Sequence, residues 1–123
     1  MALRNSRDEI LLLHNPKCSK SRQTLALLEE RGVVFSTRLY LEDPLPVEDL
    51  RDLGKRLGKS PLEYTRTKQA EFATAGLTKQ SSDDEILEAM AAAPILMERP
   101  VVIRADRAAI GRPPEDVLGL LDD

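Results

Sequence analysis

A single cysteine, Cys18, lies in a loop whose composition favours a reactive thiolate over an inert thiol. Basic residues surround it at Lys17, Lys20 and Arg22, and a helix is expected to begin directly after the cysteine. The free N–H groups and the positive dipole end of a helix N-terminus stabilise a thiolate, and the same groups bind anions. Most free cysteines are small buried hydrophobes, but flanks such as Lys17 and Ser19 give Cys18 no apolar surroundings. We therefore predict a nucleophilic thiolate at Cys18.

Two further polar residues of this loop are expected to support the thiol. Ser21 lies three residues after Cys18, so its hydroxyl is expected to reach the sulfur. His14 precedes the loop and is expected to donate a hydrogen bond into it. Because a lone histidine after a strand is as often structural as catalytic, His14 is assigned a supporting role and not that of a general base.

The segments around the cysteine loop predict a βαβ unit. Residues 9–13 form a continuously apolar run, which is typical of a strand covered on both faces. A helix is expected over residues 19–31, with Gly32 as its C-terminal cap. Residues 33–41 alternate in polarity and are predicted to form a second strand.

The following residues predict several helices and then a hairpin. Leucines at helical spacing indicate an amphipathic helix from about residue 47 to Gly58. Capping boxes at residues 60–63 and 82–85 start two more helices, the first of which is expected to carry Arg66 near its end. The remaining expected elements are a weak helix over residues 71–75, a hairpin of residues 101–103 and 108–110, and a terminal helix from Pro113.

This order of elements predicts an α/β fold of the thioredoxin-like kind. Its small mixed four-stranded sheet would be flanked by helices, with a helical insertion between the βαβ and ββα halves. The length of 123 residues suits a single domain over residues 1–123.

Composition excludes several classes of function. Hydrophobic residues at 41% and charged residues at 32% describe a soluble protein without a membrane span. The polar N-terminus lacks a secretory signal, so we expect a cytoplasmic protein. We also expect a monomer. One cysteine and one histidine are too few soft ligands for a zinc site, so no bound metal is expected. A net charge of -3, with no tryptophan, argues against nucleic-acid binding.

Four segments together resemble the glutaredoxin-dependent arsenate reductases and their shorter relatives. They are residues 14–22 (His-Asn-Pro-Lys-Cys-Ser-Lys-Ser-Arg), 39–42 (Leu-Tyr-Leu-Glu), 94–102 (Pro-Ile-Leu-Met-Glu-Arg-Pro-Val-Val) and 110–115 (Ile-Gly-Arg-Pro-Pro-Glu). The resemblance runs from about residue 12 to residue 121, which is nearly the whole chain. Each segment alone is a weak signal, but their order and spacing together are highly specific.

The resemblance implies a site in which three arginines hold the substrate oxyanion. By position these are Arg66, Arg99 and Arg112, with Cys18 as the catalytic nucleophile. Arginine suits this role because its planar guanidinium stays charged and donates two parallel hydrogen bonds to adjacent oxygens. The family pattern also implies a cis peptide bond between Arg99 and Pro100. Arg66 has the weakest local pattern, and Lys68 is a rival for its place.

The activity implied by the resemblance is the reduction of arsenate to arsenite through a thiolate–arsenate adduct. Glutathione would be the co-substrate and glutaredoxin the electron donor, because the chain has no second cysteine to resolve the adduct. One alternative is a glutathione- or glutaredoxin-linked thiol oxidoreductase acting on another substrate. A less favoured alternative is a regulator similar to the Spx-type proteins, which share this fold and bind RNA polymerase. Those redox sensors carry Cys-x-x-Cys, whereas this chain has Cys18 and Ser21.

Overall fold

The computed structural model describes residues 9–121, which fall into two compact units. The first unit combines residues up to 43 with those from 99 onward, and the second comprises residues 44–98. The second unit is therefore inserted into the first, as the sequence predicted for its helical insertion. The expectation of a single domain over residues 1–123 stays a prediction.

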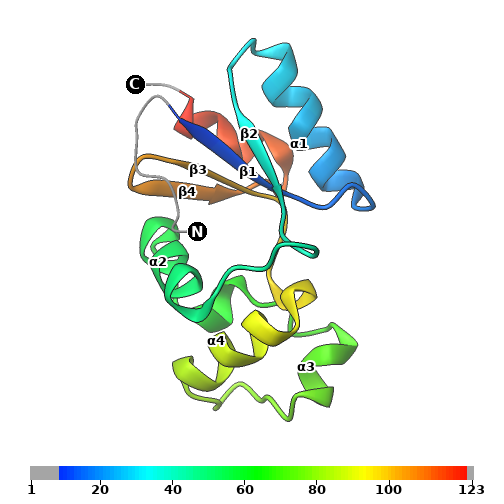
Figure 1. Ribbon diagram of the computed structural model, residues 1–123, viewed down its shortest axis with the longest axis vertical. Coiled ribbons are helices and arrows are strands. Elements are labelled where there is room, and N and C mark those ends of the chain that lie inside the picture. Colours follow the sequence, from blue (N-terminus) through cyan, green and yellow to red (C-terminus); the bar gives the residue numbers. More distant parts are fainter. Residues whose placement is uncertain (1–8, 122–123) are drawn as a thin grey trace. The chain divides into compact units, whose positions relative to one another are not determined.

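The first unit is built on a mixed four-stranded sheet in the order β2-β1-β3-β4 (Figure 1). The β1 strand pairs in parallel with β2 and antiparallel with β3, and β4 pairs antiparallel with β3. At the centre, Leu12 lies opposite Thr37 on one side and Val102 on the other. The predicted mixed sheet is confirmed. The strands are β1 (Ile10–His14), β2 (Ser36–Leu39), β3 (Val101–Arg104) and β4 (Arg107–Ile110).

One face of this sheet packs against α1 (Ser19–Glu30) and the 3₁₀ segment η3 (Pro114–Leu120). Strand side chains alternate between the two faces of a sheet, so every second residue of β1 and β3 points toward these helices. The buried residues of this cluster are Ile10, Leu12, Leu28, Val102, Val117 and Leu120. This core fixes α1 against the sheet, and α1 begins at the cysteine loop.

The end of α1 follows the prediction, whereas β2 is shorter than expected. Gly32 has a φ of 68°, and its N–H bonds to the carbonyl of Glu29 at 3.1 Å, as expected of a glycine cap. The predicted strand over residues 33–41 is wrong at both ends, because only Ser36–Leu39 pair with β1. A turn begins at Leu39, whose carbonyl accepts hydrogen bonds from the N–H groups of Glu42 and Asp43. The chain therefore turns away from β1 after Leu39, and the strand pairing ends there.

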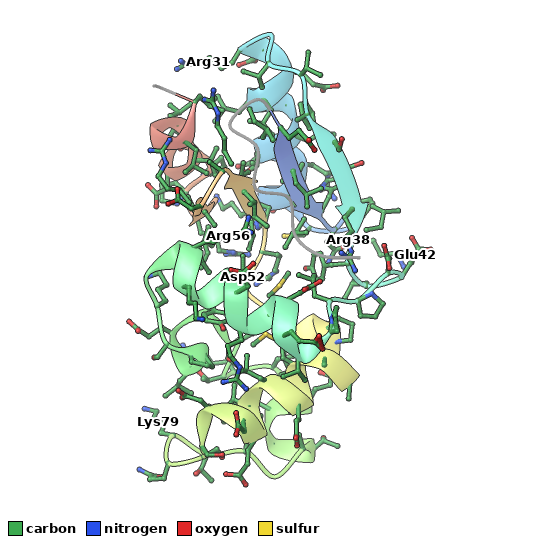
Figure 2. All side chains as sticks on the ribbon, turned by 60° about the vertical axis from the view of Figure 1, so that its left-hand side comes forward. Arg31, Arg38, Glu42, Asp52, Arg56 and Lys79 are labelled. Carbon is green, nitrogen blue, oxygen red and sulfur yellow. The ribbon has the colours of Figure 1, made fainter. Side chains whose placement is uncertain are left out.

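The second unit consists of short helices around a core of its own. Its elements are α2 (Val47–Leu57), η1 (Pro61–Tyr64), α3 (Ala70–Thr74), α4 (Asp83–Ala92) and η2 (Pro94–Leu96). Leu53 and Leu87 are fully buried, and the Tyr64 hydroxyl donates a hydrogen bond to the Leu50 carbonyl at 2.9 Å. An i,i+4 ion pair of 3.0 Å joins Arg56 to Asp52 along α2 (Figure 2).

The predicted helix carrying Arg66 is wrong, although its starting signal is real. Ser60 and Glu63 form the expected capping box, but the segment is a single 3₁₀ turn that ends at Tyr64. Thr65 instead forms an antiparallel bridge with Met97, and the Arg66 N–H bonds to the Leu96 carbonyl at 2.7 Å. Tertiary pairing of the backbone has therefore replaced the helical continuation.

The other predicted elements are present with small changes. The capping box at Ser82 opens α4, and the hairpin turns at Ala105, which has a φ of 56°. The terminal segment beginning at Pro114 is a 3₁₀ helix, not an α-helix. Between residues 9 and 121, each helix is too short or too polar to cross a lipid bilayer.

Candidate active site

Cys18 occupies the residue that caps the N-terminus of α1. The Asn15 carbonyl accepts from the Cys18 N–H at 3.0 Å, and the Asn15 side chain accepts from the Lys17 N–H at 3.0 Å. The Cys18 carbonyl in turn accepts the first helical bond, from the Arg22 N–H at 3.0 Å. Asparagine therefore folds the loop through its own side chain. As a result, the thiol faces the unpaired N–H groups of the first helical turn.

The electrostatic environment of the sulfur favours its anionic form. Burial raises the pKa of the partly buried Cys18 thiol, but a hydrogen bond from the Ser21 backbone N–H and the charge of Arg99 lower it. Further lowering of this pKa comes from the Lys20 N–H and from Arg112. The lowering effects prevail, so the pKa of Cys18 lies below that of an ordinary cysteine. The expectation of a thiolate-prone cysteine therefore has a defined structural basis.

Ser21 supports the loop by a route different from the one predicted. Its buried hydroxyl lies 2.6 Å from the Nδ1 atom of His14 and accepts a hydrogen bond of 3.0 Å from the Asn15 N–H. The contact of Ser21 with the sulfur of Cys18 comes from its backbone N–H instead. His14 makes the expected hydrogen bond into the loop, and its partner is the Ser21 hydroxyl. Both residues therefore fix the loop that carries the thiol.

His14 gives the protein a pH-dependent stability. Desolvation, reinforced by the charge of Arg22, lowers the pKa of His14 below 6.5. The unfolded chain therefore binds a proton more readily, so this contribution is complete above about pH 6.5 and is lost as the pH falls below it. We expect the free energy of unfolding, measured by urea titration, to fall as the pH is lowered below about 6.5. His14 is the only histidine, so His14→Gln should remove this slope; an unchanged slope would contradict the assignment.

Arg99 and Arg112 come from the two ends of the hairpin, and the charge of Arg99 and a contact of Arg112 both act on Cys18. Arg99 precedes β3 and Arg112 follows β4. The Arg112 Nε–H donates to the Arg99 carbonyl at 2.8 Å, and its NH2 group lies 3.9 Å from the sulfur of Cys18. The structure therefore brings two of the three predicted oxyanion-binding arginines to the predicted nucleophile.

Both of these arginines precede a proline in a cis peptide bond. The bond between Arg99 and Pro100 is cis, as the family resemblance implied. The bond between Arg112 and Pro113 is also cis, which the sequence analysis missed. The only local signal was that Pro113 follows an arginine and precedes another proline.

Gly111 holds the arginine segments close to α1. Its N–H donates to the Pro100 carbonyl at 2.9 Å. A Cβ atom on Gly111 would lie 2.6 Å from the Thr24 Oγ1 atom and 2.9 Å from the Pro100 ring. Thr24 is buried on α1, so neither neighbour can yield easily. This close approach joins the helix that carries Cys18 to the segments that carry the arginines.

Gly111→Ala should therefore destabilise the protein and disturb the site. We expect a loss of roughly 1–3 kcal/mol in the free energy of unfolding, because overpacking forces the backbone to shift. Gly119→Ala is the matched control, since nothing lies within 4 Å of its added Cβ, and its effect should stay within about 0.5 kcal/mol. Equal denaturant midpoints for the two variants would refute the close approach.

Arg66 belongs to the second unit, where its position is set by η2. Its backbone N–H bonds to the Leu96 carbonyl, and its guanidinium donates to the Ile95 carbonyl at 3.2 Å. These contacts do not test a role of Arg66 in oxyanion binding, so that role stays a prediction.

Between residues 9 and 121, no group of three or more histidine, cysteine, aspartate or glutamate side chains is placed to hold a metal ion.

Comparison with known proteins identifies the family. The model of the ArsC family matches residues 13–120. The chain belongs to the ArsC family. Within this ArsC family, the arsenate reductase of Haemophilus influenzae is 41% identical over 114 residues, covering 91% of this chain and 98% of the relative. YfgD of Escherichia coli K12, named as an uncharacterized protein, is 45% identical over 115 residues, covering 92% and 97%.

A solved structure supports the same assignment. The arsenate reductase from Vibrio cholerae superimposes with a TM-score of 0.88 and 42% identity, covering 94% of this chain and 99% of that chain. The predicted thioredoxin-like fold of this ArsC protein is therefore confirmed. Its relatives named as arsenate reductases support an oxidoreductase activity.

Proposed function

We propose that this protein reduces arsenate to arsenite, with Cys18 as the nucleophile. The observation that carries the proposal is the position of the Arg112 guanidinium, 3.9 Å from the sulfur of Cys18, whose pKa the backbone N–H groups of Ser21 and Lys20 also help to lower. A thiolate beside a fixed cation is suited to attack a tetrahedral oxyanion, because the charge on the oxygens is neutralised as the sulfur approaches.

In the proposed reaction, the Cys18 thiolate attacks arsenic(V) and displaces one oxygen, which leaves as water after protonation. Arg99 and Arg112 neutralise the remaining oxygens. Glutathione then attacks the arsenic of the adduct, and a second water leaves. A glutaredoxin thiolate then attacks the glutathione sulfur and forms a mixed disulfide. The bond between that sulfur and arsenic breaks, and its electron pair stays on arsenic, which becomes trivalent. Water releases arsenite and restores the Cys18 thiol.

Overall, arsenic acid and two thiols give arsenous acid, one disulfide and one water, so atoms and electrons balance. The protein needs external thiols because Cys18 is its only cysteine. Such reductants are characteristic of a reducing compartment, so a cytoplasmic location is part of the proposal. We also propose that the protein acts as a monomer without a bound cofactor. Phosphate resembles arsenate in shape and charge, but a thiol does not reduce phosphorus(V).

The decisive experiment measures arsenite formed from arsenate by the purified protein with glutathione, glutaredoxin and a glutathione-regenerating system. We expect formation to require all components, and we expect phosphate to inhibit it without being consumed. Arsenite formation no faster than in the protein-free mixture would refute the proposal. If glutathione alone supports the full rate of arsenite formation, glutaredoxin is not the electron donor.

Arg66 is proposed as the third oxyanion ligand, on the strength of the family pattern. We expect Arg66→Ala to raise the KM for arsenate about tenfold, the lower bound for loss of one charge-assisted hydrogen bond. Lys68→Ala is the matched control, because Lys68 is the rival for this role and should leave the KM unchanged. The reverse result would transfer the role to Lys68.

A further inference from the structure

A pocket of about 270 Å³ lies beside the cysteine loop within the first unit. One wall is the loop itself, and the other is the turn that follows β2. We call it the leucine pocket because Leu39 and Leu41 contribute its apolar surface. Its lining residues are His14, Asn15, Pro16, Lys17, Leu39, Leu41 and Glu42.

Both walls of the leucine pocket are fixed by hydrogen bonds within the chain. In the turn after β2, the Leu39 carbonyl accepts from the Asp43 N–H at 2.8 Å. Arg38 holds the same turn through a 2.9 Å hydrogen bond to the Asp43 carbonyl and a 3.2 Å ion pair with its carboxylate. Figure 2 shows Arg38 and Glu42 at this end of β2. On the loop side, Asn15 makes the turn bonds described above. Because these walls are already ordered, binding a ligand does not incur the entropic cost of ordering them.

The leucine pocket places two partly exposed apolar side chains beside each other. Leu39 and Leu41 are each 37% exposed, while the intervening Tyr40 is buried at 1%. Among residues 9–121, the one other exposed large hydrophobic side chain is Val34. Two such side chains on one pocket beside a reactive cysteine indicate a contact surface for a ligand.

Charged groups at the leucine pocket restrict the chemistry of this ligand. Lys17 is a cationic residue of one wall, and Glu42 is an anionic residue of the other. A ligand with an apolar stem, a carboxylate and an ammonium group would complement all of these features. Glutathione has this composition, since its γ-glutamyl end carries both charged groups.

The position of the pocket suits the delivery of a thiol to Cys18. Lys17 directly precedes the cysteine, and their Cα atoms are about 3.8 Å apart across a trans peptide bond. A tripeptide spans at most roughly 10 Å when extended. Cys18 does not line the pocket but follows its lining residue Lys17 in the chain, so a tripeptide is long enough to place its terminal part in the pocket and its central cysteine at an adduct on Cys18.

We propose that the leucine pocket is the binding site for glutathione and orients its thiol toward the arsenic on Cys18. This inference rests on the proposed function, because glutathione enters there as the reductant. The step that it positions is the attack of the glutathione sulfur on arsenic, which forms a sulfur–arsenic bond and releases water.

The first test measures binding without any reaction, using the full chain and S-methylglutathione, which cannot reduce or be oxidised to a disulfide. Titration is followed by calorimetry and by amide chemical shifts. We expect shifts to concentrate in residues 14–17 and 39–42, and Leu39→Ser/Leu41→Ser to weaken binding at least tenfold. Val34→Ser is the matched control, because Val34 is an 87% exposed apolar residue at the other end of β2; it should leave the affinity unchanged.

The second test uses turnover to separate this inference from the proposed function. In the arsenate assay, the double variant should show a KM for glutathione at least tenfold higher, with the KM for arsenate unchanged. If only the KM for glutaredoxin rises, the surface binds that protein and the inference is wrong. If the wild type makes no arsenite but S-methylglutathione still binds at the leucine pocket, the proposed function fails and the site stands. If S-methylglutathione changes amide chemical shifts mainly outside residues 14–17 and 39–42, the leucine pocket is not the glutathione site.

Discussion

Cys18→Ser will reduce arsenite formation to the protein-free background, a loss of at least about a thousandfold in kcat/KM. Serine retains the shape of the side chain and can still accept the N–H hydrogen bonds at this helix terminus. Its hydroxyl ionises far less readily, however, and it cannot form or transfer a sulfur–arsenic bond. The measurement is the rate of arsenite production with glutathione and glutaredoxin in excess.

The same variant separates loss of chemistry from loss of structure. Its circular dichroism and denaturant midpoint should match those of the wild type, because the sulfur is only partly buried. Mass spectrometry of wild-type protein incubated with arsenate should detect an arsenic adduct on the peptide containing Cys18, and the serine variant should lack it. Residual turnover well above background in Cys18→Ser would rule out this residue as the nucleophile.

Arg112→Ala will lower kcat/KM for arsenate roughly tenfold to a hundredfold. This range corresponds to the loss of one charge-assisted hydrogen bond to the oxyanion, about 1.5–3 kcal/mol. Because Arg112 also helps to lower the pKa of Cys18, its removal should slow thiol alkylation near neutral pH. Kinetic assays over a range of arsenate concentrations measure the first effect, and alkylation rates measure the second.

Two further variants show whether the contribution of Arg112 to kcat/KM depends on the geometry of its guanidinium or only on its charge. Arg112→Lys keeps the charge but loses the planar fork and the Nε hydrogen bond to the Arg99 carbonyl, so it should recover only part of the lost activity. Arg107→Ala removes an exposed arginine of β4 and should leave kcat/KM unchanged. Equal losses for Arg107→Ala and Arg112→Ala would mean that net charge, not position, is what matters.

Local signals in the sequence predicted the starts and ends of most elements. The capping box at Ser82 needs only residues within one helical turn, and Gly32 needs only its own backbone conformation. Such interactions are complete within a few residues, so their outcome can be read from the sequence. The βαβ order and the hairpin then left few ways to arrange the sheet.

The errors concern residues whose conformation depends on distant partners. Ser60 starts a helix correctly, but Thr65 pairs with Met97, more than thirty residues away, and this pairing ends the helix before Arg66. The extent of β2 likewise depends on where its partner β1 ends. No pattern within the local segment specifies either outcome.

At the site, the sequence identified the reactive group better than the contacts that activate it. Cys18 was evident from its basic flanks and its place before a helix. The hydroxyl of Ser21 was expected at the sulfur, but it serves His14 and the Asn15 N–H instead. A hydroxyl three residues along a helix has several acceptors and donors within reach, and only the folded geometry selects among them.

The most direct test of the account is the pH dependence of Cys18 alkylation by iodoacetamide in the wild-type protein. We predict an apparent pKa clearly below the value of about 8.5 for an unperturbed thiol. The same titration of Arg112→Ala should give a higher pKa than the wild type. A wild-type value at or above about 8.5 would show that the sulfur is not held as a thiolate, and the proposed chemistry would then have no nucleophile.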